Sequence, residues 1–273
     1  MPAATGNYIW YLDRVHRRLL PRTYLEIGVC LGRSLALALP GTRAIGVDPN
    51  PTIRYAIGRE AKVFPMTSDA FFAHHAADEY GTERIDLAFI DGLHLAEAAL
   101  RDFTNVERWA HPGSVVLMHD LYPIDEASAT REQQTVLWSG DVWKAALALR
   151  TFRPDLTVTT LAARPTGLGI VTGLDPGSTV LHDRYDEIVR WMDDLDYADL
   201  MTDKDGQLNA IPADPHAMAQ LLPAPFRSAH AGALVRRRAL RMPPTLAELA
   251  RDGIRRAKLS GLAPTVERVR RAV

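Results

Sequence analysis

The sequence contains one cysteine among its 273 residues, and it has neither an excess of one charge nor a long apolar run. Cys30 cannot form a disulfide within the chain, which is typical of a protein from a reducing compartment. The formal net charge of −1 gives no general attraction to nucleic acid. Residues 1–20 lack the apolar core of a signal peptide or membrane span. We therefore expect a cytoplasmic protein with no transmembrane segment and no nucleic-acid partner.

The rest of the composition, 47% hydrophobic and 24% charged, is that of an ordinary soluble protein. A chain of this length can hold one sizeable α/β domain and an appendage. Changes in composition predict three regions. They are a domain with an N-terminal helix over 1–181, a helical extension over 182–226 and a basic, partly helical tail over 227–273.

The first region alternates short apolar runs with helical patterns, which predicts an α/β fold with a Rossmann-like, doubly wound sheet of seven strands and helices on both faces. The last strand, 167–173, is expected to be antiparallel and to form a hairpin with 156–161. Apolar residues at helical spacing predict an amphipathic helix packed on the sheet before the first strand. These residues are Ile9, Leu12, Val15 and Leu19.

A glycine turn follows the first predicted strand. The strand ends near Glu26. Gly28 and Gly32 follow it, and a helical pattern begins at Ser34. Glycine is needed where the backbone takes a positive φ or approaches a ligand closely, and the N–H groups of a helix start can receive an anion. The spacing fits neither the dinucleotide fingerprint nor the P-loop. It predicts a cofactor-binding turn, although paired glycines also occur in strand–turn–helix units without a ligand.

A second acidic residue, Asp48, ends the next apolar run about twenty residues after the glycines. In a doubly wound sheet it would lie at the carboxyl end of the second strand, where a carboxylate can accept hydrogen bonds from both ribose hydroxyls. The alternative is that Asp48, which precedes Pro49, only caps a turn.

Ionisable side chains follow two further strands. One apolar run ends in Asp91, with His94 three residues later, and another ends in His119 and Asp120. If these strands are neighbours, the four side chains converge at the sheet edge where α/β proteins bind ligands. Carboxylates suit Mg²⁺, and His94 could accept a hydroxyl proton near neutral pH. The structural alternatives are a turn at Asp91, a helix cap at His94 and a hydrogen-bonded pair at His119 and Asp120.

The glycine spacing, with an acid before it, resembles the first motif of the class I S-adenosylmethionine (SAM) methyltransferases. The phrases Ile-Asp-Gly-Leu-His at 90–94 and Met-His-Asp at 118–120 resemble the metal-dependent small-molecule O-methyltransferases, in particular the macrocin O-methyltransferase and cephalosporin-hydroxylase-like group. The resemblance covers about residues 22–175 and excludes the tail. It implies SAM as cofactor and methyl transfer to a hydroxyl of a small molecule or sugar, in natural-product or polysaccharide biosynthesis.

The resemblance also implies cofactor contacts. In that family, residues after the third strand approach the adenine, which implies contacts from Ser68 and Asp69. Both residues also fit a helix N-cap. The complete set of predicted cofactor-binding residues is Glu26, Gly28, Gly32, Ser34, Asp48, Ser68, Asp69 and Asp91.

In the metal-dependent enzymes an acid ends the fourth strand, a base follows it, and an acidic or amide pair ends the fifth strand. Asp91, His94 and Asp120 match these positions, whereas His119 stands where the family has Asp. The resemblance implies a divalent ion, Mg²⁺ by expectation, held by Asp91, His119 and Asp120. Imidazole suits transition metals better than Mg²⁺, so the identity of the ion stays open. Alternatively, His119 points at the acceptor.

Residues 121–135 contain Pro123 and lack periodicity, so a loop is expected that could fold over the acceptor. Asp141 follows this loop and is a candidate for the substrate site or for a plain helix start. The predicted catalytic residues are His94, His119 and Asp141.

Two other functions remain open. One is a non-catalytic partner protein that binds SAM or a nucleotide, and the other is an oxidative, hydroxylase-like enzyme on the same fold.

The tail, residues 227–273, holds 12 Arg and Lys against three acids, and 245–248 has the form of a capping box. It could contact a membrane surface or an acidic partner, or be a solvated helix. A homo-oligomer is also left open.

Overall fold

The computed structural model describes residues 6–228 of the chain. The capping box at 245–248 and nearly all of the basic tail lie outside these residues. A single 8-stranded sheet of order β3-β2-β1-β4-β5-β7-β6-β8 forms the centre. Within 6–228, no helix combines the length and the apolar character that a membrane span requires.

Seven strands of the sheet are the predicted ones. Parallel strands make up the first five, which are β1 (Thr23–Ile27), β2 (Arg43–Val47), β3 (Lys62–Phe64), β4 (Ile85–Ile90) and β5 (Ala110–His119). The strand β7 (Leu168–Thr172) is antiparallel to both β5 and β6 (Thr157–Leu161). The doubly wound sheet with an antiparallel last strand is thereby confirmed.

An eighth strand, β8 (Ala210–Ile211), was not predicted, and it pairs in parallel with β6. It comes from the extension that was expected to be helical. Two residues are too few to show an alternating pattern, so the sequence carries no signal for this strand.

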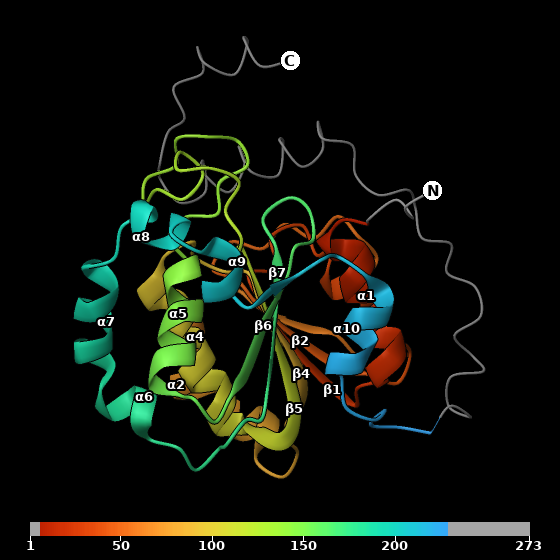
Figure 1. The fold of residues 1–273 in the computed structure, drawn as a ribbon. Coiled ribbons are helices and arrows are strands. Elements are labelled where there is room, and N and C mark those ends of the chain that lie inside the picture. The colour runs from red at the N-terminus through yellow and green to blue at the C-terminus, as the bar shows by residue number, and fades with distance from the viewer. Residues whose placement is uncertain (1–5, 229–273) are drawn as a thin grey trace.

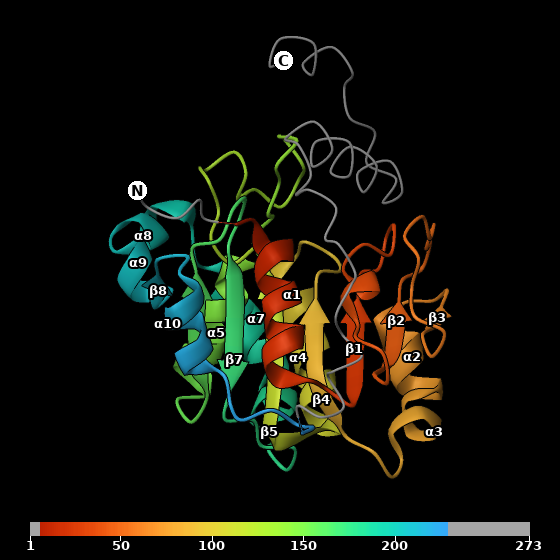
Figure 2. The ribbon, with the colours of Figure 1, turned by 90° about the vertical axis from the view of Figure 1, so that its right-hand side faces the viewer.

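Helices cover both faces of the sheet (Figure 1). One face carries α1 (Tyr8–Leu19) and α10 (Pro215–Leu221), and Figure 2 shows α1 in front of the sheet, running roughly along the strands. The other face carries α4 (Ala96–Trp109), α5 (Trp143–Phe152) and α7 (Tyr185–Asp193). The remaining helices are α2 (Ser68–His74), α3 (Ala76–Tyr80), α6 (Val180–Asp183), α8 (Tyr197–Met201) and α9 (Lys204–Gln207). The predicted N-terminal amphipathic helix is confirmed.

One predicted helix differs from the observed structure. The pattern that begins at Ser34 forms only the 3₁₀ turn η1 (Leu35–Leu37), because Pro40 follows closely and disfavours a helix before it. The helix α5 begins at Trp143, and Trp138 lies before it, with its indole Nε1 donating to the carbonyl of Thr130 in the preceding loop at 2.5 Å.

The last described residues lie at the edge of the sheet that is formed by the amino ends of its parallel strands. The amide of Phe226 donates to the carbonyl of Leu19 at 2.7 Å. The Arg227 guanidinium donates to the carbonyls of Leu20 and Gly41 at 3.0 and 2.9 Å. The last described residues are therefore attached at the edge opposite the carboxyl ends of β4 and β5.

Candidate active site

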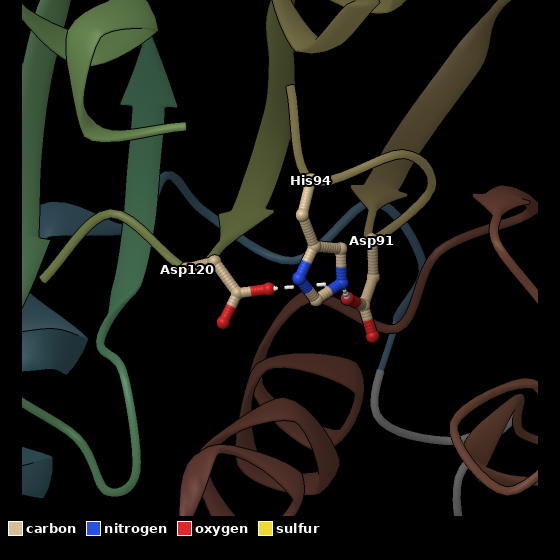
Figure 3. A group of neighbouring side chains, drawn as sticks. All are labelled: Asp91, His94 and Asp120. Atoms are coloured by element: carbon tan, nitrogen blue, oxygen red, sulfur yellow. Dashed lines mark ion pairs between the residues drawn. The ribbon is translucent and has the colours of Figure 1, made fainter. Parts of the chain in front are cut away.

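The carboxyl ends of β4 and β5 bring the predicted acids together. The two strands are parallel neighbours, with Ile90 paired to Met118, so Asp91 and Asp120 emerge at the same sheet edge. Both carboxylates are buried. Figure 3 shows their side chains converging, with the His94 ring between them. The predicted convergence of the two strand ends is therefore present.

Asp120 leaves its strand in an unusual conformation. Its φ is 66°, in the left-handed region that non-glycine residues seldom adopt. The buried hydroxyl of Thr166 donates to Asp120 Oδ1 at 2.5 Å and fixes the side chain. Backbone strain of this kind costs on the order of 1–3 kcal/mol and is common at functional sites. The surrounding hydrogen bonds thus hold this carboxylate in one orientation.

His119 lies between the two acids as a proton donor. Its Nδ1 is 3.2 Å from Asp91 Oδ1 and 3.3 Å from Asp120 Oδ1. Burial by itself lowers the pKa of His119, but Asp120 and Asp91 outweigh it and raise that pKa to about 9. Burial likewise raises the pKa of Asp120, yet the charges of His119 and His94 bring that pKa below its ordinary value. At neutral pH His119 is therefore an imidazolium that compensates one carboxylate.

His94 presents one nitrogen to each side of the site. Its Nδ1 lies 2.8 Å from the carbonyl oxygen of Trp138. Because a carbonyl only accepts hydrogen bonds, Nδ1 carries a proton, and in the neutral ring Nε2 carries the lone pair. Nε2 is 3.2 Å from Asp120 Oδ2 and 3.8 Å from Asp91 Oδ1. The ring also stacks on the Trp138 indole, with 4.9 Å between centroids and 19° between planes.

Three of these groups fit a divalent cation. One ligand atom from each of Asp91, His94 and Asp120 can be chosen so that all lie within 4.8 Å of one another. Two carboxylate oxygens and one imidazole nitrogen can serve ions such as Mg²⁺ or Mn²⁺. His119, which was predicted as a ligand together with Asp91 and Asp120, lies beside this group with Nδ1 turned to both carboxylates.

The glycine turn packs directly against this group. Gly28 has a φ of 89°, and a Cβ added there would lie 1.9 Å from the carbonyl oxygen of Asp91. Gly32 has a φ of 77°, and its added Cβ would lie 3.1 Å from Ile53 Cδ1. Both positions therefore need glycine for the fold itself, and the turn and the acids form one structure.

The acids of the predicted cofactor site hold the turn. Glu26 is fully buried and accepts hydrogen bonds from the hydroxyls of Tyr24 and Ser34, each at 2.7 Å. Asp48 accepts from the amides of Cys30 and Asn50, also at 2.7 Å. Asp48 thus caps the glycine turn as well as its own turn. Cofactor binding by Glu26, Ser34 and Asp48 stays a prediction.

The residues predicted to approach the adenine have partners within the protein. Thr67, the residue before them, is the side-chain cap of α2 and accepts from the Ala70 amide at 3.2 Å. Asp69 accepts from Arg101 Nε at 2.9 Å. Ser68 hydrogen-bonds the buried Asp102 carboxyl. Adenine contacts from Ser68 and Asp69 also stay a prediction.

Asp141 is buried beside the start of α4. Its Oδ1 accepts from the Ala96 amide at 2.8 Å, and its Oδ2 accepts from Arg131 Nη1 at 2.7 Å. The first contact is only two residues along the chain from His94. Asp141 therefore belongs to the surroundings of the site, and both of its oxygens have protein partners.

Sequence reasoning missed three contributors, Tyr8, Arg131 and Thr166. Tyr8 and Thr166 contact His119 and Asp120 from elements far away in the sequence. Arg131 lies in a loop without periodicity. None of the three stands in a motif, so only the folded arrangement identifies them.

The site thus lies on a doubly wound sheet with one antiparallel strand, which carries polar groups at its carboxyl edge. A family model described as a methyltransferase domain matches residues 25–121, from β1 to just past Asp120. The predicted methyltransferase domain is confirmed for this stretch. No curated protein matches the chain.

Several solved structures are similar to this chain. An O-methyltransferase from Bacillus cereus in complex with SAH has 16% identity and a TM-score of 0.48, covering 60% of this chain and 79% of its own. Another is TomG from Streptomyces achromogenes, an O-methyltransferase involved in tomaymycin synthesis and in complex with SAM. It has 17% identity and a TM-score of 0.46, and the match covers 62% of this chain and 80% of TomG. A putative O-methyltransferase from Klebsiella pneumoniae has 14% identity and a TM-score of 0.47, and the match covers 64% of this chain and 84% of that protein.

Proposed function

We propose that the protein transfers a methyl group from SAM to a hydroxyl of a small molecule or sugar, and that Asp91, His94 and Asp120 hold a divalent cation for this reaction. One observation carries the proposal: three ligand atoms of these side chains lie within 4.8 Å of one another. They do so at the sheet edge where α/β proteins bind ligands. The glycine turn adjoins them through Gly28.

The chain's own residues would act mainly by positioning. SAM supplies an already activated methyl group, so orientation of the two reactants provides much of the acceleration. A bound divalent cation would make the acceptor hydroxyl more acidic and hold it in place. Because Gly28 packs against Asp91, a cofactor on the glycine turn would lie next to the acceptor site.

His119 supports the two carboxylates in this proposal. Two buried carboxylates that share a site repel each other, and one of them would otherwise tend to take up a proton. The imidazolium of His119 donates to Asp91 and Asp120 and compensates one of the negative charges. The pair then keeps a net charge of about −1 at neutral pH, which favours a cation beside it.

The lone pair on His94 Nε2 could serve either as a metal ligand or as the base that the sequence predicts. The distance of 3.2 Å to Asp120 Oδ2 supports the first role, because both groups then point at one common position. The two roles predict different results for His94→Gln. Loss of a ligand weakens metal affinity, whereas loss of a base lowers turnover and leaves metal affinity unchanged.

Calorimetry tests the proposal without knowledge of the acceptor. SAM and S-adenosylhomocysteine are titrated first, followed by Mn²⁺, into the wild type, Asp91→Ala, Asp120→Ala and His94→Gln. We expect SAM affinity within about threefold of wild type and Mn²⁺ affinity at least about tenfold weaker in all three variants. Glu83→Ala, which removes an exposed acid outside both this group and the predicted cofactor site, serves as the control. With an acceptor in hand, Asp91→Ala and Asp120→Ala should also lose turnover.

Other results would favour the alternatives. Binding of SAM without any metal-linked binding or methyl transfer would indicate a non-catalytic partner protein. Dependence on iron and oxygen in place of SAM would indicate a hydroxylase-like enzyme. The ligand set does not support that second alternative, because non-haem iron oxygenases typically use two His and one carboxylate, and this group has the reverse composition.

A further inference from the structure

Two strands at one side of the sheet, β2 and β3, lack a covering α-helix on the face that carries α1. Within residues 6–228, the chain between β1 and β2 forms only η1, and the chain between β2 and β3 forms no helix. Figure 2 shows α1 in front of the centre of the sheet, with β2 and β3 beside it. The other face of these strands packs against α2 and α3. Because parallel strands are normally covered on both faces, this side of the sheet is incompletely packed.

Apolar side chains stay partly exposed on this side, and we call them the β2–β3 patch. Ile53 is 38% exposed, and a Cβ added at Gly32 would lie 3.1 Å from Ile53 and 3.5 Å from Ile57. The other members are only partly buried against the cluster that includes α1. The β2–β3 patch consists of Leu37, Ala38, Ile53, Ile57, Ala61 and Val63. It is an apolar surface to which a further element can be added.

The loop between β2 and β3 also holds the glycine turn. The amides of Thr52 and Arg54 donate to the carbonyls of Cys30 and Leu31, at 2.8 and 2.9 Å. An element that packs on the β2–β3 patch would therefore restrain the turn that is predicted to bind the cofactor.

The described chain ends next to the β2–β3 patch. The Arg227 guanidinium donates to the Gly41 carbonyl at 2.9 Å and to Thr42 Oγ1 at 3.1 Å. Gly41 follows Ala38 of the patch by three residues, and Thr42 directly precedes β2. Residues 229–273 therefore begin at the border of the patch.

The tail contains a segment with the sequence pattern of an amphipathic helix. In 245–258, which starts with the capping box, apolar residues recur at i, i+3, i+4, i+7, i+8 and i+11. They are Leu246, Leu249, Ala250, Gly253, Ile254 and Ala257. A helix of this length measures about 21 Å, which matches the roughly 16 Å of the five residues of β2. Such a helix is marginal in water by itself and needs a surface to pack on.

The tail and the rest of the chain have opposite net charges. Residues 227–273 hold 12 Arg and Lys against three acids, whereas residues 1–226 hold 20 Arg and Lys against 30 acids. The formal net charge of −1 is therefore the sum of two large and opposite contributions. Attraction between them favours contact of the tail with its own chain, and a short tether gives an effective concentration on the order of 1 mM.

We propose that the segment 245–258 packs as a helix on the β2–β3 patch of its own chain, with Leu249 and Ile254 against the patch. Its polar face, which includes Arg251 and Arg255, then faces solvent. The connection over 229–244 can span up to about 50 Å, which is enough to reach every part of the patch. The docked segment supplies the cover that β2 and β3 lack on this face.

Hydrogen exchange of the full-length protein, followed by mass spectrometry, tests the proposal with two double variants. Leu249→Glu with Ile254→Glu places two charges in the apolar stripe of the segment. Arg251→Gln with Arg255→Gln makes the same change in net charge on the opposite face and is the matched control.

We expect residues 34–41 and 52–63 to exchange at least about tenfold faster in the Leu249→Glu, Ile254→Glu variant than in the wild type, because the cover is lost. The control variant should exchange at wild-type rates. Residues 185–193 of α7 should exchange at wild-type rates in both variants, which verifies that the fold is intact. Wild-type rates at 34–41 and 52–63 in the stripe variant would overturn the proposal.

A spin label measures the position of the segment by nuclear magnetic resonance. Gly58→Cys places the label next to Ile57, where an added Cβ has no atom within 4 Å among the described residues, and Cys30→Ser removes the native thiol. We expect this label to broaden the amide signals of 245–258. A label at Asp193→Cys, in α7 on the opposite face, should leave them sharp. Equal effects of the two labels, or no broadening from the first, would contradict the proposal.

Two further measurements identify any other occupant of the patch or partner of the segment. In a mixture of spin-labelled protein with unlabelled, ¹⁵N-enriched protein we expect no broadening, and broadening would mean that the segment docks on a second copy. Protection of 245–258 that appears only after phosphatidylglycerol vesicles are added would mean that the segment binds a membrane surface. Either result would overturn docking on the segment's own chain.

Discussion

The ring of His119 lies against the ring of Tyr8, with 3.9 Å between their centroids. Tyr8 is the first residue of α1, and its amide donates to the carbonyl of Arg164 at 2.9 Å. Asp120 and Asp91 raise the pKa of His119 to about 9, and the face of the buried Tyr8 ring favours the imidazolium form of this side chain. The N-terminal helix therefore stabilises the charged group that joins Asp91 and Asp120.

We expect Tyr8→Leu to lower the free energy of unfolding by about 2–4 kcal/mol, because it removes a buried aromatic ring and its contact with the imidazolium. Tyr8→Phe keeps the ring and should lose about 2 kcal/mol less. Urea unfolding at pH 7 measures both variants. Equal losses would mean that the ring contact contributes nothing.

Replacement of Gly140 should disturb the site far more than replacement of an open glycine. Gly140→Ala places a Cβ against the His94 carbonyl and imposes a positive φ on a non-glycine residue, so we expect at least about 2 kcal/mol of destabilisation and weaker Mn²⁺ binding. Gly58→Ala is the control, since an added Cβ there has no atom within 4 Å among the described residues. Thermal unfolding and calorimetry compare the two. Similar results for both variants would contradict the close approach at His94.

Asp102 should make the protein less stable as the pH rises. Burial raises its pKa from 3.8 to about 7, so the folded state keeps a proton that the unfolded state has lost. The free energy of unfolding then declines between pH 3.8 and about 7, by up to about 1.4 kcal/mol per pH unit from this residue, and levels off above. Asp102→Asn should remove this contribution and be more stable than wild type at pH 8. Parallel curves for the two proteins from pH 4 to 8 would refute the assignment.

His16 should have the opposite effect at acidic pH. It is completely buried in α1, and neither ring nitrogen has a hydrogen-bond partner among residues 6–228. Burial lowers its pKa from 6.5 to about 3, so protons bind the unfolded state preferentially between these values and stability falls as the pH decreases through that range. His16→Phe keeps an aromatic ring beside Tyr24 and should flatten this acid dependence. Urea unfolding from pH 3 to 7 provides the comparison with wild type.

Much of the fold could be predicted from the sequence because parallel strands covered on both faces appear as continuous apolar runs. The run that ends in Ile90 is buried along its whole length, as is the part of β5 from Ser114 to His119. Parallel strand ends meet at one edge, so the meeting of Asp91 and Asp120 could be inferred without coordinates. The sequence did not predict the two-residue strand β8 or the early end of the helix after Ser34.

The surroundings of the acids were beyond sequence reasoning. His119 was predicted as a ligand, and its protonation depends on two carboxylates within 3.3 Å, which no local pattern reveals. The partner of His94 Nδ1 is a backbone carbonyl, a group that every residue possesses. Thr166, which orients Asp120, is distant from it in the sequence. Such contacts arise from tertiary packing of loops that carry no periodic signal.

The most direct measurement is a crystal structure of the protein with Mn²⁺ and S-adenosylhomocysteine, with anomalous diffraction recorded to locate the metal. The proposed function predicts one strong anomalous peak bounded by a carboxylate oxygen of Asp91, His94 Nε2 and a carboxylate oxygen of Asp120, with the cofactor against the turn at Gly28 and Gly32. A site without metal, or a metal bound elsewhere while these three side chains keep their mutual contacts, would contradict it.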